Sequence, residues 1–459
     1  MTWSTLTRTT TSLDTRRLLM AALGVALVLR VAAILLTGDI SRNANIWEYG
    51  EQALCALENG GQLCTYYSPG GGASYPSAYM PPMLSYFWLA LFQTFGDGSL
   101  ARAVWLGANT AAALGCVALV FHLSLKLWPS RCAAFAAAML VATYPTFVFV
   151  TATYHQTNWA ALFLLGITAV ALKLAQGGSP VLYGASGGFL CGLAALNRTE
   201  MLVIGPILIA LGAAWRRRAS VFLTIGVAGA LALVLTLAPW TVRNHEEFGR
   251  FIPTAQSMGY NLWKGFNAHT IGSGSQSEAM QTPARDELVA IAASVPHGES
   301  YETHLQDAYM QAVKDDVQNA SPLRLLQLTA TKVVLLWGYD WTDTSTTASV
   351  TYLLPWLAVN LLVIPGLITA WRRRRSVRAA PAAIYATALG LLTVAYAVTS
   401  VHARYRMHLE PYLFILAGIG IETLWLRFRP IHPARKMPST GTAADPSADP
   451  SPSVKTVLR

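Results

Sequence analysis

The chain has 459 residues, of which 53% are hydrophobic and only 12% are charged, and its mean hydropathy is +0.40. This composition is typical of a protein that crosses a membrane many times, and it excludes an ordinary soluble domain. The net charge of +10 does not indicate a nucleic-acid partner, because the basic residues gather in short clusters between apolar runs and residues 240–330 are acidic on balance.

Apolar segments recur along the whole chain. A window of about 19 residues, which is the length that spans a bilayer, predicts roughly ten transmembrane helices. They lie near residues 18–37, 99–123, 132–150, 157–175, 181–197, 201–214, 219–239, 349–370, 380–400 and 410–426. The predicted fold is therefore an all-α polytopic membrane protein, a bundle of about ten helices.

Clusters of arginine and lysine predict the orientation of these helices. Arg16 and Arg17 precede the first, Arg216 to Arg218 follow the sixth, and Arg372 to Arg375 follow the eighth. All such clusters fall on one side if both termini are cytoplasmic, so we expect a multi-pass protein of the cytoplasmic membrane. The apolar stretch 83–95 would break the alternation if it crossed, and we expect a re-entrant or surface helix on the outer side.

The same alternation divides the chain into five parts: a cytoplasmic lead (1–17), an N-terminal transmembrane module with an outer loop at 39–98 (18–239), an extracytoplasmic cap segment (240–348), C-terminal transmembrane helices (349–426) and a disordered cytoplasmic tail (427–459). Pro239 and Trp240 are predicted to stop the seventh helix at the interface. In the cap, we expect a polar helix over 304–317 and a helix over 323–337 that lies along the outer surface.

One charged residue falls inside the first apolar segment. Arg30 lies near its outer end, where a buried charge is costly. We expect its side chain to extend toward the outer headgroups.

The first outer loop is polar, aromatic and acidic. Residues 46–58 have helical spacing, which predicts a short amphipathic helix whose apolar face, including Leu57, rests in the lipid boundary. Asn45 followed three residues later by Glu48 also fits a capping box, a purely structural role for Glu48. Gly70 to Gly72 then predict a loop that returns toward the bilayer.

Two cysteines, Cys55 and Cys64, share this loop in what would be an oxidising compartment. A disulfide between them would staple the short helix to the loop that follows. The spacing alone does not decide between a disulfide and two free thiols.

The other outer turns carry further polar residues. His155 lies between the third and fourth helices, where it fits either sugar contact or the aromatic and polar belt of the interface. Arg198 and Glu200 are close enough in sequence to pair with each other. In the last outer turn, Arg404 and Arg406 flank Tyr405, and these arginines fit either headgroup anchoring or phosphate binding.

The short cytoplasmic connections leave no room for a nucleotide-binding domain, and the chain has neither a P-loop nor a glycine-rich dinucleotide fingerprint. We therefore expect any chemistry on the outer face, with a donor that the membrane carries, such as a polyprenyl-phosphate sugar. Such a transfer needs a carboxylate that accepts the proton of the acceptor hydroxyl, and fixed cations that hold the departing phosphate. Glu48 offers the first; Arg404, Arg406 and Arg243 offer the second.

Several motifs in this order resemble a known family: WEYGEQAL (47–54), YPSAYMPPML, PWTVRN with FGRF and GYNLWKG, and HARYRMHLEP. The combination, spread over residues 18–426, resembles the GT-C superfamily of integral membrane glycosyltransferases. The nearest branch is that of the bacterial relatives of protein O-mannosyltransferases and lipid A aminoarabinose transferases.

This resemblance implies a polyprenyl-phosphate sugar donor, inversion at the sugar, and an acidic catalytic base at the head of the first outer loop. Asn45 stands where the family has an aspartate, so Glu48, the residue before Tyr49, becomes the candidate base, with Asp39 and Glu51 as reserves. The candidate substrate-binding residues are Tyr49, His155, Arg243, Asn244, Arg404, Tyr405 and Arg406.

Two other functions stay open. One is a lipid or lipid-linked sugar transporter, or flippase; the other is an inactive relative that binds a lipid-linked sugar, which Asn45 favours. The expected partners are a polyprenyl-phosphate sugar, a glycan, lipid or protein acceptor, and membrane lipids, without nucleic acid. No cofactor is predicted, and the sequence leaves a divalent metal open.

Overall fold

The computed structural model describes residues 15–65, 74–338 and 353–428, and the regular structure of these residues is helical. Their only β pairings are two isolated bridges, Cys64 with Pro76 and Ser273 with Val401. The all-α fold class is thus confirmed. The predicted glycine loop at 70–72, the start of the lead and the tail beyond 428 lie outside the described residues.

All ten predicted membrane segments are helical: α2 (Thr15–Thr37), α5 (Ser99–Leu127), α6 (Arg131–Thr143) with α7 (Pro145–Thr151), α8 (Thr157–Ala175), α9 (Pro180–Ala195), α10 (Met201–Ala214), α11 (Ala219–Phe248), α18 (Leu354–Arg372), α19 (Ala379–Ala397) and α20 (Glu410–Phe428). Within the described residues, seven helices are long and apolar enough to cross a membrane, or eight if the bent pair α6 and α7 is one span. The apolar helices α9 and α10 are shorter than that.

The turns predicted to be cytoplasmic lie at one end of the bundle, which we call the basic end. Three hydrogen bonds join them: Lys126 donates to Gln176 (3.1 Å), Arg216 to the Gly178 carbonyl (2.7 Å), and the Arg378 backbone N–H to the Leu127 carbonyl (3.2 Å). The basic clusters therefore share one end, as the alternation of ten helices requires.

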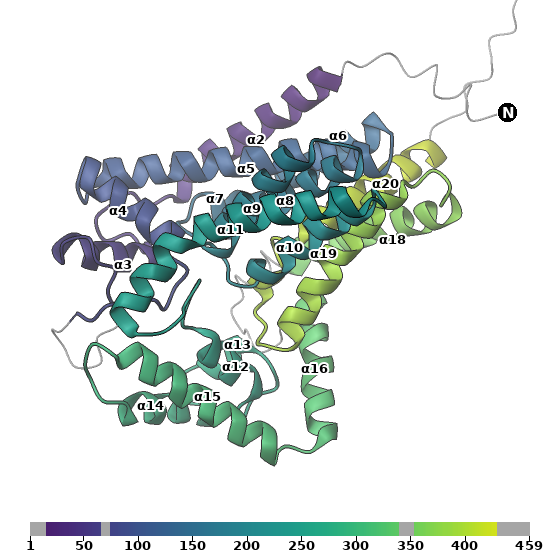
Figure 1. Cartoon of the computed structure of the whole chain (residues 1–459). Coiled ribbons are helices and arrows are strands. Elements are labelled where there is room, and N and C mark those ends of the chain that lie inside the picture. The colour runs from purple at the N-terminus through teal and green to yellow at the C-terminus, as the bar shows by residue number, and fades with distance from the viewer. Residues whose placement is uncertain (1–14, 66–73, 339–352, 429–459) are drawn as a thin grey trace, which may run out of the picture.

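The remaining helices lie at the opposite end, which we call the cap end (Figure 1). The first outer loop forms α3 (Trp47–Glu58) and α4 (Met83–Phe95). The cap contains α12 (Met258–Phe266), α13 (Gly274–Glu278), α14 (Pro283–Ser294), α15 (Tyr301–Asn319) and α16 (Pro322–Trp337), and the last outer turn forms the 3-10 helix η2 (Ala403–Arg406).

Helix α4 has 13 residues, too few to cross a bilayer. Helix α16, predicted to lie along the outer surface, runs from the cap to the bundle (Figure 1). The reason is that Leu335 and Leu336 at its C-terminal end are buried in the core of the bundle. Trp337 at the same end donates to the Thr393 hydroxyl of α19 (3.1 Å). Helix α16 is thus a strut that fixes the cap on the bundle.

Helix α11 continues through Pro239 to Phe248, so the prediction that Pro239 and Trp240 stop it is wrong. A proline inside a helix removes one backbone hydrogen bond but does not end the helix where other contacts hold the chain. Here Trp240 donates to the Thr254 carbonyl (2.6 Å). The helix ends where Gly249 adopts a left-handed conformation (φ 64°), which glycine adopts without steric cost.

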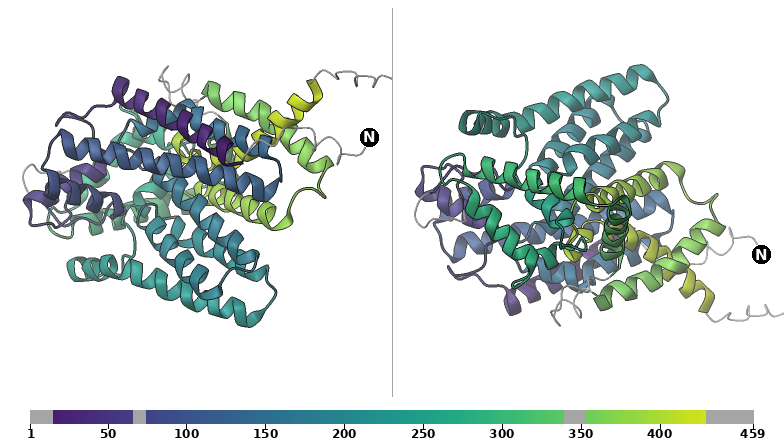
Figure 2. Two further views of the ribbon diagram at one scale, coloured as in Figure 1. Left: turned by 90° about the horizontal axis from the view of Figure 1, so that it is seen from above. Right: turned by 90° about the horizontal axis from the view of Figure 1, so that it is seen from below.

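Helices α9 and α11 lie against each other at one side of the bundle, where they form part of the teal layer that protrudes in Figure 2. Their close approach depends on Gly188. A Cβ atom at this position would lie 1.9 Å from the carbonyl oxygen of Gly229 on α11. Small residues allow membrane helices to approach closely in this way, because lipid supplies no hydrophobic drive between helices.

Arg30 does not extend to the headgroups, because its side chain is fully buried. Its guanidinium donates to the carbonyls of Ala142 (2.9 Å) and Val141 (3.1 Å) at the end of α6. The helical donor for the Val141 carbonyl would be the N–H of residue 145, which is a proline and has none. Arg30 therefore satisfies the carbonyls that the break between α6 and α7 exposes.

We expect Arg30→Met to destabilise the bundle by about 1–3 kcal/mol for each carbonyl left without a donor. Arg30→Lys, which keeps a donor but loses the planar fork, should recover part of the loss. Thermal unfolding in detergent tests this, with Leu27→Met as the control at an exposed position of the same helix. Equal melting temperatures for Arg30→Met and Leu27→Met would contradict the role of Arg30.

Candidate functional site

The first turn of α3 places Glu48. The Asn45 side chain accepts a hydrogen bond from the Trp47 backbone N–H (3.0 Å), and the N-cap residue, Ile46, makes no side-chain cap. The capping box is therefore wrong: Asn45 caps alone, and Glu48 does not reach back to it. Among the described residues, the half-buried Glu48 carboxylate has no hydrogen-bond or ion-pair partner.

The apolar face of α3 was predicted to rest in the lipid boundary. It packs on protein instead. Tyr49, Ala53 and Ala56 are buried in a cluster that includes Trp88 of α4, whereas Leu57 is 39% exposed. Because α3 rests on α4, the direction of its first turn is fixed by protein contacts. Burial raises the pKa of Tyr49 well above its ordinary value, and the nearby Glu48 carboxylate adds to the shift.

Trp47 connects this turn with two others. Its backbone has a φ of 58°, the left-handed region that bulky residues rarely adopt, and such strain of about 1–3 kcal/mol persists only where surrounding contacts hold it. The Trp47 ring meets the His155 ring edge-on at 4.9 Å. The Arg404 guanidinium lies 5.9 Å from the centre of the same ring. Three outer turns therefore meet beside Glu48.

The two arginines of the last turn have different environments. Arg406 is buried, pairs with Glu410 (3.1 Å) and donates to the Gly338 carbonyl at the end of α16 (2.7 Å). Arg404 is half-buried, and its guanidinium has no hydrogen-bond or ion-pair partner among the described residues. The structure brings Arg404 and His155 to the ring of Trp47, the residue before Glu48, but it places Arg406 elsewhere, as a structural link to α16.

A buried network lies behind Arg404. Arg198 pairs with Glu200 (2.5 Å), as expected, and donates to the Tyr396 hydroxyl (3.1 Å). That hydroxyl donates to Glu200 (2.7 Å) and shares a hydrogen bond with His408 (3.0 Å). Tyr405, a predicted site residue, stacks on this network: its ring lies 5.2 Å from that of Tyr396, and the Arg198 guanidinium lies 5.3 Å from its centre.

The pKa shifts in this network have simple causes. Burial opposes the charged forms, but the ion pair outweighs it, so the pKa of Arg198 is raised and that of Glu200 is lowered to about 2. Burial and the neighbouring arginines lower the pKa of both His155 and His408 to about 3. Both histidines are therefore neutral near pH 7, and neither adds positive charge to the site.

The cap contributes a second carboxylate next to the last outer turn. Glu278 on α13 accepts hydrogen bonds from Lys264 (3.0 Å) and from the Tyr260 hydroxyl (2.8 Å), both on its Oε1 atom. His402 lies 3.9 Å from Oε2 of Glu278 and shares a hydrogen bond with Ser275 (3.1 Å). Tyr260, Lys264 and His402 belong to the GYNLWKG and HARYRMHLEP motifs, but no motif includes Glu278, which joins them from α13.

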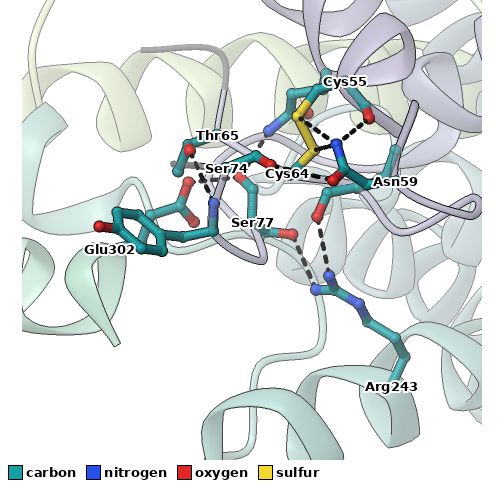
Figure 3. The surroundings of a disulfide bond; sticks show 11 residues. Cys55, Asn59, Cys64, Thr65, Ser74, Ser77, Arg243 and Glu302 are labelled. Atoms are coloured by element: carbon teal, nitrogen blue, oxygen red, sulfur yellow. Dashed lines mark hydrogen bonds between the residues drawn. A yellow bond between two sulfur atoms is a disulfide. The ribbon is translucent and has the colours of Figure 1, made fainter. Parts of the chain in front are cut away.

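Arg243 and Asn244 lie on the last turns of α11, away from Arg404. Arg243 donates to the carbonyls of Ser77 (2.9 Å) and Leu63 (3.0 Å), which are next to the paired residues Pro76 and Cys64 (Figure 3). Asn244 is buried and donates to the Ile252 carbonyl (2.8 Å). In this structure, both side chains therefore hold loops in place.

The disulfide between Cys55 and Cys64 is present, with Cα atoms 5.8 Å apart. Next to it, Glu302 of α15 accepts hydrogen bonds from the Ser77 hydroxyl (2.5 Å) and the Ala78 backbone N–H (2.8 Å). Figure 3 shows the disulfide, Ser77, Arg243 and Glu302 side by side. These contacts fix the cap to the first outer loop. Burial raises the pKa of Glu302 to about 7, although these hydrogen bonds oppose the shift.

The reserve carboxylates lie apart from Arg404. Asp39 is exposed and accepts a hydrogen bond from the Ser41 backbone N–H (2.8 Å), which lowers its pKa. Glu51 is exposed on α3, and the charged groups that act on it are Arg102 and Asp97, which pair with each other at 2.7 Å. Across the described residues, no three His, Cys, Asp or Glu side chains gather in a way that could hold a metal ion.

Comparisons with known proteins agree with this architecture. Residues 79–283 match glycosyltransferase family 87. The chain is similar to the oligosaccharyltransferase AglB of Archaeoglobus fulgidus in complex with an inhibitory peptide and a dolichol-phosphate, at 14% identity and a TM-score of 0.55, over 91% of this chain and 51% of that one. The apo form of the Archaeoglobus enzyme gives 13% identity and a TM-score of 0.54, over 91% and 51% of the two chains.

ArnT from Cupriavidus metallidurans, bound to undecaprenyl phosphate, is similar at 11% identity and a TM-score of 0.41, over 88% of this chain and 77% of that one. No curated protein sequence matches. The chain spans about half the length of the archaeal oligosaccharyltransferase.

The likeness to AglB shows a polytopic membrane protein with the GT-C fold. Taken with the match to glycosyltransferase family 87, it supports a membrane glycosyltransferase of the GT-C superfamily. The resemblance noted in the sequence motifs is thereby confirmed.

The docking of the cap on the first outer loop should depend on pH through Glu302. Its folded pKa of about 7 lies above the ordinary value of 4.5, so its contribution to stability is fully present below about pH 4.5 and is lost as pH rises through 7. We expect Glu302→Gln, which stays neutral, to remove this fall between pH 5 and 8.

The measurement is the melting temperature in detergent as a function of pH, with Glu299→Gln as a matched exposed control in the cap. If the melting temperature of Glu302→Gln falls with rising pH in parallel with that of the unchanged protein, Glu302 is not the group that causes the fall.

Proposed function

We propose that the protein transfers a sugar from a polyprenyl-phosphate-linked donor to an acceptor hydroxyl, with inversion at the sugar, at the extracytoplasmic face of the cytoplasmic membrane. The observation that carries this proposal is a pair of charges where three outer turns meet, the carboxylate of Glu48 and the guanidinium of Arg404, which have no partner among the described residues. A base and a phosphate ligand are the two groups that such a transfer requires.

Glu48 is the proposed base. Because none of the described residues occupies its carboxylate, both oxygens remain available to a substrate hydroxyl. The acceptor oxygen forms a bond to the anomeric carbon as the bond from that carbon to the phosphate oxygen breaks, and the hydroxyl proton passes to Glu48. A single direct displacement of this kind inverts the anomeric configuration. Positioned general bases contribute typically 10²–10⁴-fold to a rate.

Arg404 is the proposed ligand of the departing phosphate. Its guanidinium presents a fork of donors that matches phosphate geometry, and no carboxylate of the described residues lies within hydrogen-bond distance to neutralise it. Trp47 supports it from one side and adjoins Glu48 along the chain, which links the position of the cation to that of the base. The neutral His155 lines the same corner.

Two further observations support the donor and the side of the membrane. The similar AglB structure contains a dolichol-phosphate, which is a polyprenyl-type lipid phosphate. The arginine-rich turns gather at the basic end, opposite the site, and such clusters stay in the cytoplasm. The site would then face a compartment without nucleotide sugars, where a lipid-carried donor is required.

We expect Glu48→Gln to lower the transfer rate by about 10²–10⁴-fold while polyprenyl-phosphate binding is retained, because the amide keeps the shape but cannot accept the proton. The assay is transfer from a labelled polyprenyl-phosphate sugar in membranes that contain the protein. Glu58→Gln, which changes an exposed glutamate on the same helix, is the control and should transfer normally. Undiminished transfer by Glu48→Gln would assign the base elsewhere.

We expect Arg404→Gln to weaken polyprenyl-phosphate binding at least tenfold, since a hydrogen bond to a charged group contributes about 1.5–3 kcal/mol. Arg42→Gln serves as the control, because Arg42 also lies at the cap end and its side chain is 74% exposed. Binding of a fluorescent polyprenyl phosphate to the purified protein measures both. An equal loss in the two variants would show that general charge attraction, and not a specific site, holds the phosphate.

A further inference from the structure

In the described part of the chain, the carboxylate of Glu278 in the cap accepts hydrogen bonds through only one of its two oxygens. Oε1 of Glu278 accepts from both Lys264 (3.0 Å) and Tyr260 (2.8 Å). Oε2 has no hydrogen bond among the described residues, and the nearest polar atom recorded for it is Nε2 of His402, at 3.9 Å. The side chain remains 34% exposed. Glu278 is therefore held firmly through one oxygen while the other is open to a donor from outside the protein.

The position of Glu278 beside the last outer turn is enforced by the backbone. The Gly274 N–H donates to the Val401 carbonyl (2.8 Å), which joins the start of α13 to the residue before His402. A Cβ atom at Gly274 would lie 2.2 Å from Nε2 of His402, so this approach requires glycine. One helical turn later along α13, Glu278 faces the turn that carries Arg404.

The same turn connects Glu278 to the proposed transfer site. The His402 ring contacts the Tyr405 ring at 5.0 Å, and Arg404, which lies between these two residues in sequence, contacts Trp47 beside Glu48. Burial opposes the charged form of Glu278. Its pKa is nevertheless lowered, because Lys264 and, to a smaller extent, Arg404 stabilise the carboxylate. Arg404 thus contacts the residue before Glu48 on α3 and acts on Glu278 on α13.

We propose that Glu278 is an acceptor-binding residue, and that the acceptor is a glycan whose hydroxyl groups donate to the open Oε2 oxygen. This inference rests on the proposed function and adds the class of acceptor to it. A carboxylate oxygen accepts hydrogen bonds from hydroxyls, and a sugar offers several on one ring. Glu278 holds the acceptor on the cap side of Arg404, while Glu48 on the other side takes the proton.

A peptide acceptor is less well matched by the described surface. One common way to bind an extended peptide is to add it as a strand to a sheet edge, where main-chain hydrogen bonds give affinity. The described part of the cap is helical, and its pairing is limited to the isolated bridge between Ser273 and Val401. The polar atom on offer here is a side-chain carboxylate oxygen, which suits a hydroxyl donor.

The test measures acceptor binding directly, without donor, by saturation-transfer NMR on the full-length protein in nanodiscs. The probes are mannotetraose, maltotetraose and a serine- and threonine-containing peptide. We expect at least one oligosaccharide to bind, and Glu278→Gln to weaken that binding tenfold or more. Glu299→Gln, which changes an exposed glutamate elsewhere in the cap, should leave it unchanged.

Because Glu278→Gln also deprives the nearly buried Lys264 of its carboxylate, a second variant is needed. Glu278→Asp keeps the charge but withdraws the oxygens by one methylene, and it should also weaken oligosaccharide binding. Retained polyprenyl-phosphate affinity shows that either variant is folded. The proposal is overturned if the unchanged protein binds no oligosaccharide, or if both folded variants bind it normally. It is also overturned if only peptide binding depends on Glu278.

These results are separable from the proposed transfer itself. Acceptor binding is read without donor or chemistry, so a failure of Glu48 as the base would leave the Glu278 measurement intact. Conversely, Glu278 variants that bind oligosaccharide normally would refute the acceptor site and leave the donor site at Arg404 standing.

Discussion

A charge that leaves water must be paired, and this constraint determines which charges at the cap end remain available to a ligand. Three basic side chains at the cap end form ion pairs with carboxylates: Arg198 with Glu200, Lys264 with Glu278, and Arg406 with Glu410. Hydrogen bonds from the two arginines, Arg198 to Tyr396 and Arg406 to the Gly338 carbonyl, join the paired turns to α19 and to the end of α16 in one frame. Among the described residues, Glu48 and Arg404 have no hydrogen-bond or ion-pair partner, and the proposed chemistry depends on them.

The sequence predicted the membrane architecture well, because the bilayer imposes strong rules on length and charge. All ten apolar segments are helical, and the basic turns share one end. The failures occurred where a remote segment supplies a partner. Arg30 is buried because Pro145 leaves a carbonyl of α6 without its donor, and α11 passes Pro239 because its last turns hold two loops. Neither partner is visible in a local window.

The site was predicted in part, for a similar reason. Arg404 does lie at the ring of Trp47, the residue before Glu48, but the motif could not separate Arg404 from Arg406. In a 3-10 turn with three residues per turn, positions two apart point about 120° away from each other, so one arginine faces Trp47 and the other faces Glu410. Tyr396 and Glu278 were missed, since they come from a helix end and from the cap, where no spacing links them, and His408 was not singled out although it lies in the HARYRMHLEP motif.

The most direct test of this account is an experimental structure of the protein with a polyprenyl phosphate bound. The account predicts that the phosphate oxygens lie within hydrogen-bond distance of the Arg404 guanidinium, with Glu48 facing the position where the anomeric carbon would be attached. A phosphate bound at the basic end, or at Arg243 with Arg404 still unoccupied, would contradict it.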